Sequence, residues 1–401
     1  MTFRNRPLAR LGAAALLASG AFTALGTPAF AEGAKTDLSI DVAGTRVAAG
    51  AEGKVGFVKL GNKGDTTPTD VKILVDLSKL DQDTAEVAVL GQSCAEDPAK
   101  HVWTCSLTAE EIPAPGATVD LPLISAKKDP AKSAPYSAPV TFTVVTPEDD
   151  DKSNNSKTAT VEFADKGGVD LGVLVPDVSS QLSWVDGDIK EQKPVLNPGD
   201  ETTVVAALFN QGDQIAAGVG LKLTLPKGVT LSQNLEDCAI SADRRSADCQ
   251  DSEIQINPQD DLYGVFKVKV AADLKAPVTL SGGNVTVAAL GAADPTAKRL
   301  AKSATTKLPS YLTNDRPAGV PTDIDPSDNS DGFSVLLAAV GNGGAGGGEG
   351  DDDGGLPVTG PQAGLIGGVG AAVLAAGGVL FMMARRRRVV LVVPGDEKPS
   401  A

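Results

Sequence analysis

The sequence is poor in the residues that most often carry chemistry. Its 401 residues include one histidine, four cysteines and only 4% aromatic residues. A Ser-His-Asp arrangement would have to use His101, and a zinc site would have that one imidazole and no Cys-x-x-Cys pair. The glycine-rich stretch 341–348 is not followed by the Lys and Ser or Thr of a phosphate loop. We therefore expect no catalytic residues, no metal ion, no cofactor and no enzymatic activity.

Basic residues are also scarce relative to acidic ones. Lys and Arg together number 36 and Asp and Glu 51, which gives a formal net charge of −15. Several of the arginines stand in the first ten residues and in 385–388, so the part between the two ends is more acidic still. A surface of this charge repels nucleic acid and anionic lipid. The composition therefore argues against nucleic acid as a partner.

The first 31 residues have the three parts of a secretory signal. Arg4, Arg6 and Arg10 give a basic start, residues 11–25 are apolar, and Ala29-Phe30-Ala31 supplies small residues for a peptidase. We expect cleavage before Glu32 and export of the rest. The alternative is an uncleaved membrane anchor, which the shortness of the apolar run disfavours.

The C-terminal end has three ordered elements. A pentapeptide at 356–360 is followed by a segment at 361–388, in which the uncharged stretch 363–384 precedes four arginines, and by a tail at 389–401. The uncharged stretch is long enough for a transmembrane helix, and the arginines suit its cytoplasmic side. The residues of the pentapeptide are Leu356, Pro357, Val358, Thr359 and Gly360.

This arrangement resembles the LPxTG sorting signal of Gram-positive cell-wall-anchored proteins, although its tail beyond the arginines is longer than usual. The resemblance implies that a sortase attacks the carbonyl of Thr359 and joins this residue to peptidoglycan. Sortase and peptidoglycan are then partners, and the membrane holds the chain only before sorting. The alternative is a plain single-pass anchor that contains the pentapeptide by chance. Residues 339–355, mostly Gly and Asp, predict a flexible spacer before the signal.

Residues 32–165 and 166–338 contain a diverged duplication. Four short motifs recur in the same order, which chance matches rarely do. The pairs are Asp37-Leu38-Ser39-Ile40 with Asp170-Leu171-Gly172-Val173, Gly61-Asn62-Lys63-Gly64 with Phe209-Asn210-Gln211-Gly212, Ala138-Pro139-Val140-Thr141 with Ala276-Pro277-Val278-Thr279, and the acidic turns at 151–156 and 325–330.

The four cysteines support the duplication. Cys94 and Cys105 are 11 positions apart, and so are Cys238 and Cys249. Exported thiols are usually oxidised, so this even count predicts one local disulfide in each half. A metal site or a reactive thiol is the alternative.

Alternating apolar residues predict strands throughout both halves. Val71, Ile73, Val75 and Leu77 line one face of one segment, and 202–209, 219–225, 262–270 and 285–290 have the same period of two. Turn residues such as Asn-Pro-Gly-Asp at 197–200 separate them. Many short strands without helical periodicity predict an all-β protein with two Ig-like β-sandwich domains in tandem.

The second half also resembles a repeated Ig-like domain of bacterial surface proteins. The resemblance covers roughly residues 167–338 and rests on Asn197-Pro198-Gly199-Asp200, Asn210-Gln211-Gly212, the Leu-Pro-x-Gly-Val element at 225–229 and the acidic turn at 325–329. The first half lacks the Leu-Pro-x-Gly-Val element, and its ending resembles a related adhesion-type domain. The resemblance implies a stalk or adhesive module without catalytic chemistry.

The acidic turn of the second half invites a calcium hypothesis. Asp323, Asp325, Ser327 and Asn329 alternate as the first ligands of a calcium loop do. The sixth and twelfth positions hold Asp328 and Ser334 instead of Gly and Glu, so the EF-hand pattern fails. A looser site with residues 148–151 stays open, but we favour a solvated turn whose side chains bond the backbone.

The sequence thus predicts a secreted protein attached to the cell wall, which acts as a structural stalk or adhesive module toward an unknown extracellular ligand. The alternatives are a wall-attached hydrolase or a ligand-binding receptor. A deep pocket, or exposed Trp and Tyr on one face, would favour these alternatives.

Overall fold

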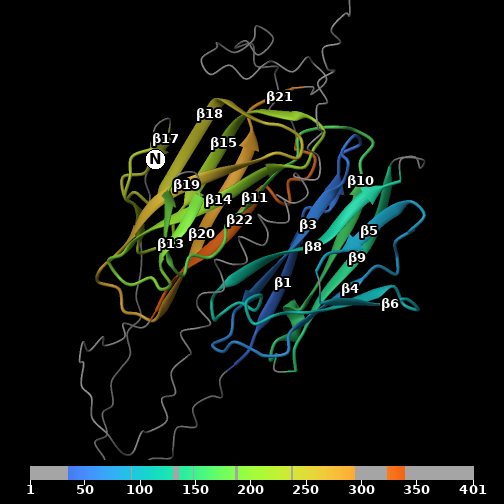
Figure 1. Ribbon diagram of the computed structural model, residues 1–401, viewed down its shortest axis with the longest axis horizontal. Helices are drawn as coiled ribbons and strands as arrows, with labels where there is room; N and C mark the ends of the chain where they lie inside the picture. The colour runs from blue at the N-terminus through green and yellow to red at the C-terminus, as the bar shows by residue number, and fades with distance from the viewer. Residues whose placement is uncertain are drawn as a thin grey trace, which may run out of the picture. The chain divides into compact units, whose positions relative to one another are not determined.

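The computed structural model describes residues 35–338 except 92, 130–134, 148, 186–187, 236–237 and 294–322 (Figure 1). The expected all-β fold is confirmed. The described residues form 22 strands and one 3-10 turn, η1 (Lys152–Asn154). None of them forms a helix long and apolar enough to cross a membrane. The signal peptide at 1–31, the spacer, the sorting segment and the expected transmembrane helix lie outside the described residues.

The first half places two sheets around one apolar core. One sheet has the order β1-β3-β8-β5 and the other β2-β10-β9-β4-β7-β6. The strands are β1 (Leu38–Ala43), β2 (Arg46–Val47), β3 (Lys54–Asn62), β4 (Lys72–Asp76), β5 (Ala85–Val89), β6 (Cys94–Asp97), β7 (Val102–Ser106), β8 (Thr118–Lys128), β9 (Tyr136–Val145) and β10 (Ser156–Phe163).

The second half repeats this plan around a second core. Its two large sheets have the orders β11-β14-β19-β16 and β17-β18-β15-β20-β22, with β21 beside β15. The strands are β11 (Leu171–Leu174), β12 (Gln181–Val185), β13 (Asp188–Lys193), β14 (Glu201–Asn210), β15 (Ile215–Thr224), β16 (Val229–Leu231), β17 (Cys238–Ile240), β18 (Ser246–Ile256), β19 (Asp261–Val270), β20 (Val278–Ala289), β21 (Ala292–Ala293) and β22 (Ser330–Leu337).

The two cores follow from the period-two patterns. Ile73 and Val75 of β4 are fully buried between the sheets of the first half, while the residues that alternate with them are half-buried. In the second half, Leu221 and Leu223 of β15 have the same role. Fully burying such a side chain contributes about 1.5–3 kcal/mol. The two halves nevertheless belong to the same compact unit.

Corresponding asparagines show that the duplication extends to side-chain contacts. Asn62 Nδ2 donates to the carbonyls of Thr66 and Pro113 at 2.8 and 3.0 Å. Asn210 Nδ2 donates to those of Gln214 and Ile256 at 2.8 and 2.9 Å. Each asparagine thereby fixes the turn that follows its strand and satisfies buried carbonyls.

The two halves differ in the segment that connects β1 to β3 in the first half and β11 to β14 in the second half. The first half has only the short β2 there, which runs parallel to β10. The second half instead has the hairpin β12–β13, which hydrogen-bonds to β14 through Leu182 N and Thr202 Oγ1 at 3.0 Å. This hairpin helps to cover the outer face of β14, where Val205 is buried.

Candidate functional site at the junction of the two halves

The outer face of β3 is buried, although it points away from the core of the first half. Val55 and Phe57 form a separate apolar cluster with Phe209 of β14, and each is 3% exposed. The rings of Phe57 and Phe209 have centroids 5.6 Å apart and are tilted by 39°. The residues that alternate along β3 therefore join the two halves, and we call this contact region the junction.

Lys54, the first residue of β3, lies in a cage of aspartates from the second half. Its Nζ is 2.8 and 2.7 Å from the two carboxylate oxygens of Asp170, 3.0 Å from Asp325 Oδ2 and 3.1 Å from Asp328 Oδ2. The side chains of Lys54 and Asp170 are fully buried. Burial of charge is costly unless charges are paired in this way, so these contacts lock the halves in one arrangement.

Local structure explains why these aspartates converge. Asp170 immediately precedes β11, and Asp325 and Asp328 stand in the turn before β22. In that turn Asp323 Oδ1 accepts from Asp325 N at 3.0 Å, and Asp325 Oδ1 accepts from Ser327 N at 3.2 Å and from its Oγ at 2.6 Å. Short polar side chains that bond the following backbone hold such turns in shape. The turn thereby presents the remaining carboxylate oxygens to Lys54.

The cage shifts the pKa values of its members in opposite directions. Burial alone would lower the pKa of Lys54, but the charges of Asp328, Asp170 and Asp325 outweigh it and raise this pKa. Burial raises the pKa of Asp328 to about 8 and that of Asp170 to about 7, against the attraction of Lys54. Asp325 keeps a lowered pKa despite its burial, because Lys54, Ser327 and Arg46 N favour its charged form. Burial therefore favours the neutral forms of Asp328 and Asp170, while the cage favours the charged forms of Lys54 and Asp325.

Lys59, also on the outer face of β3, forms a second charged contact across the junction. Its Nζ lies 2.9 Å from Asp120 Oδ2 of the first half and 2.6 Å from Asp331 Oδ1 of the second half. Burial, followed by the charge of Asp331, raises the pKa of Asp120 to about 7. Burial likewise raises the pKa of the nearby Asp177 to about 6.

Backbone groups complete the junction. Gln211 pairs with both backbone groups of Val55, accepting from its N at 2.7 Å and donating to its O at 3.1 Å. Asp177 accepts from Thr118 N and from Ser334 N, each at 2.6 Å. Gly50 N donates to Asp213 at 2.7 Å. The contacts of Gln211 and Asp177 satisfy polar groups that would otherwise be buried without partners, at about 1–3 kcal/mol each, whereas the contact of Gly50 is exposed.

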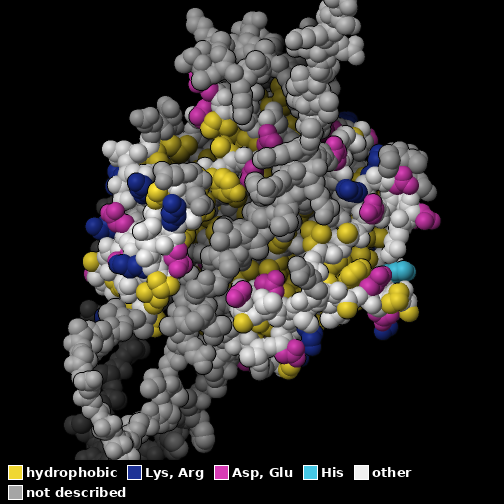
Figure 2. Space-filling model, in the orientation of Figure 1, with side chains coloured by type: hydrophobic (Ala, Val, Ile, Leu, Met, Phe, Trp, Pro, Cys, Tyr) yellow, Lys and Arg dark blue, Asp and Glu magenta, His cyan; other side chains and the backbone are white. Residues whose placement is uncertain are grey.

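The junction is chemically a fixed connection. Its ammonium groups are held as cations by carboxylates, so neither is poised as a nucleophile or base. In contrast, acidic and basic side chains are interspersed over the visible face of the molecule (Figure 2). What this arrangement can do is hold the two halves together.

The expectation of a solvated acidic turn at 323–329 is wrong in one respect. The side chains bond the backbone as expected, but Asp325 and Asp328 are 5% and 4% exposed, because the first half covers them. Lys54 supplies the cation that the calcium hypothesis assigned to a metal.

Within the described ranges no group of three His, Cys, Asp or Glu residues is arranged to hold a metal ion. Glu148 of the looser calcium hypothesis lies outside the described residues.

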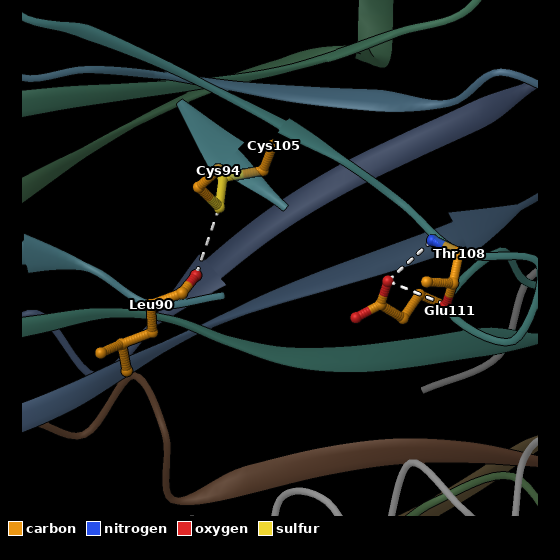
Figure 3. The surroundings of a disulfide bond; sticks show 5 residues. All are labelled: Leu90, Cys94, Cys105, Thr108 and Glu111. Atoms are coloured by element: carbon orange, nitrogen blue, oxygen red, sulfur yellow. Dashed lines mark hydrogen bonds between the residues drawn. A yellow bond between two sulfur atoms is a disulfide. The ribbon is translucent and has the colours of Figure 1, made fainter. Parts of the chain in front are cut away.

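The four cysteines form the two expected disulfides. Cys94 pairs with Cys105 across β6 and β7, and Cys238 with Cys249 across β17 and β18. Figure 3 shows the first of these beside Leu90, whose carbonyl oxygen lies 3.4 Å from Cys94 Sγ. Each disulfide joins directly opposite residues of two paired strands and so fixes their register.

The other residues singled out from the sequence are not brought together. His101 is half exposed in a turn, with Nδ1 3.5 Å from Glu96 Oε1 and 3.2 Å from Gln82 Nε2. The sorting pentapeptide, with Thr359, lies outside the described residues.

Sequence reasoning missed Lys54, Lys59 and their aspartates. In a strand such as β3, a lysine is typical of a solvent-facing position. One signal pointed to the junction: Asp328 of the second acidic turn replaces Asn154 of the first, which adds a charge at one copy of a duplicated corner.

Comparisons with known proteins add little to this description. No family model matches the chain, and no curated protein does. Among solved structures, the B domain of a biofilm-associated protein shares 8% identity at a TM-score of 0.24, covering 62% of this chain and 80% of its own. A putative membrane-anchored protein from Corynebacterium diphtheriae shares 8% at 0.21, covering 77% and 97%. The C-terminal domain of the Streptococcus pyogenes antigen I/II-family protein AspA shares 10% at 0.20, covering 64% and 95%. Likenesses this weak carry no argument about function.

Proposed function

We propose that this protein is exported, joined covalently to peptidoglycan at Thr359, and serves at the cell surface as a stalk or adhesive module rather than an enzyme. The observation that carries the proposal is the order of three elements in the sequence, Leu-Pro-Val-Thr-Gly, an uncharged stretch and four arginines. The uncharged stretch and the arginines would stall export, and Pro357 would hold the pentapeptide in a non-helical form for sortase.

The junction supports the stalk part of the proposal. A stalk must keep its parts in line, and a linker alone lets two modules move independently. Here the caged Lys54, the pair of Phe57 and Phe209 and the contacts of Gln211 oppose such movement. The acidic Gly-rich spacer at 339–355 would place this body away from the site of attachment.

Wall attachment is tested by the way in which the protein is released from cells. We expect muramidase digestion of isolated walls to release the protein with peptidoglycan fragments on Thr359, detected by mass spectrometry of its C-terminal peptide. Thr359→Ala should leave the protein in the detergent-soluble membrane fraction. Val358→Ala is the matched control, because it changes the variable position of the pentapeptide and should still be sorted.

Complete extraction of the unaltered protein by detergent alone would contradict the anchoring proposal. So would equal wall attachment of the Thr359→Ala variant. The stalk part is tested separately, through the coupling of the two halves.

A further inference from the structure

A cavity of about 360 Å³ opens on the first half, on the outer face of β1 and β3 just beyond the junction. This volume is within the range of small-molecule sites, about 300–1,000 Å³. Strands β1, β3 and β8 and the start of β10 supply its walls. Its lining includes three lysines, three residues with hydroxyl groups, one asparagine and one carboxylate, Asp41.

Comparison of the two halves explains why the cavity exists. Ser39 of β1 pairs with Gly61 of β3, and the corresponding pair in the second half is Gly172 with Phe209. The Phe209 ring lies directly over Gly172, where an added Cβ would overlap it. Gly61 has no side chain, so the corresponding space in the first half stays open. The cavity is thus a specific divergence between two copies of one fold.

Among the described residues, one lysine that lines the cavity is in no ion pair. Lys59 is held by Asp120 and Asp331, and Lys157 lies 2.8 Å from Asp41. Lys63 forms no ion pair with any carboxylate of the described residues. The charge of Lys63 helps to lower the pKa of Asp151, but Asp151 is exposed and does not line the cavity. A ligand with one negative charge would therefore gain a partner in Lys63.

The remaining lining groups suit hydroxyls. Asn154 donates through Nδ2 to Asp37 at 2.8 Å, while its Oδ1 is buried without a hydrogen-bond partner in this part of the chain. The side-chain amide of Asn154 is thus held within the first half and does not present its oxygen to a ligand. Ser39 and Ser156 line the same space, whereas the hydroxyl of Thr118 already donates to Asp177 at 3.1 Å.

We propose that this cavity binds a small saccharide that carries one carboxylate, with the carboxylate on Lys63 and sugar hydroxyls on the side chains of Ser39 and Ser156. The inference goes beyond the proposed surface role, because it assigns a ligand class to a site. Wall attachment does not enter the binding measurement, so the two proposals can fail independently.

The test uses the full chain, purified in a non-ionic detergent without sugar groups. Isothermal titration with D-glucuronate and N-acetylneuraminate is compared with D-glucose, which differs from glucuronate in lacking the carboxylate, and with inorganic phosphate. Saturable binding of at least one acidic sugar is expected, at least tenfold tighter than glucose and phosphate.

Two variants exchange residues between the halves. Lys63→Gln introduces the residue of the corresponding position, Gln211, and should weaken binding by roughly tenfold or more, the effect of one charge-assisted contact. The double variant S39G/G61F copies the Gly172 and Phe209 pair, fills the cavity and should abolish binding. Circular dichroism and thermal melting establish that each variant is folded, and Lys63→Gln carries the test if the double variant is not.

The inference is overturned if neither acidic sugar binds, if glucose or phosphate binds as tightly as they do, or if Lys63→Gln leaves the affinity unchanged.

Discussion

Replacing Lys54 with methionine removes the cation from the aspartate cage while keeping a side chain of similar length. Asp170, Asp325 and Asp328 would then face one another across a space from which water is excluded. Breaking a buried ion pair by removing one partner costs about 3–5 kcal/mol, because the charge left behind is uncompensated. We expect a loss of this size for Lys54→Met at neutral pH.

The loss should depend on pH in a way that identifies its cause. Asp328 and Asp170, with pKa values raised to about 8 and about 7, can take up protons and so relieve part of the repulsion. Asp325 has a lowered pKa through Lys54 and would lose that support. The destabilisation should therefore be smaller in mildly acidic buffer than in alkaline buffer.

The chain has two tryptophans, one in each half, which makes the coupling measurable. Trp103 lies in β7 and Trp184 in β12. Urea unfolding is followed by fluorescence in Trp103→Phe and Trp184→Phe backgrounds, so that each signal reports one half. With Lys54 present the two transitions should coincide, and with Lys54→Met they should separate, because each half has its own core.

Lys72→Met is the matched control. Lys72 pairs with Asp70 at 3.0 Å, but both side chains are exposed, so its loss should cost less than about 1 kcal/mol and leave the transitions together. If Lys54→Met behaves like Lys72→Met, the cage does not couple the halves and the reasoning is refuted.

Three further predictions concern the junction and the disulfides. Aspartates whose pKa is raised in the folded protein bind protons that the unfolded chain releases. Their contribution to the free energy of unfolding is therefore full below about pH 4 and is lost as pH rises through about 6–8. Urea midpoints should fall across that range, and a midpoint that rises there would contradict the raised pKa values. Phe57→Ala should cost about 3–5 kcal/mol and separate the two transitions, whereas a loss under about 1 kcal/mol would show that the Phe209 contact is not needed. Replacing both cysteines of either disulfide with alanine should cost about 2–3 kcal/mol, chiefly in the half that carries it, and free thiols in the secreted protein on non-reducing peptide mapping would contradict the pairing.

Much of the fold could be predicted because its signals are local or repeated. Alternation over residues 71–77 gives β4, since burial on one face requires a period of two. Equal cysteine spacing gives the two disulfides, because the same hairpin occurs in each half. The recurrence of Asn62 and Asn210 in the two halves marks one turn that both copies need.

The junction could not be predicted in the same way, because its contacts join residues far apart in the chain. Lys54 is 116 positions from Asp170 and 271 from Asp325, and nothing in its local pattern distinguishes a caged lysine from a solvated one. Val55 and Phe57 alternate as core residues do, yet they are buried by the second half. Period-two patterns say which residues share a face, but they do not say what covers that face.

One divergence between the copies lies where one half meets the other. In the second half, Asp170 and Asp328 leave a charged corner that Lys54 of the first half neutralises. In the first half, the corresponding residues are Asp37 and Asn154, and Asn154 Nδ2 donates to Asp37 within the same half. The carboxylates of the second-half corner therefore require an ammonium group from the first half, whereas the carboxylate of Asp37 in the first-half corner accepts from the amide of Asn154. The pair of Asn154 and Asp328 thus distinguishes the corner that is neutralised within its own half from the corner that contacts the other half.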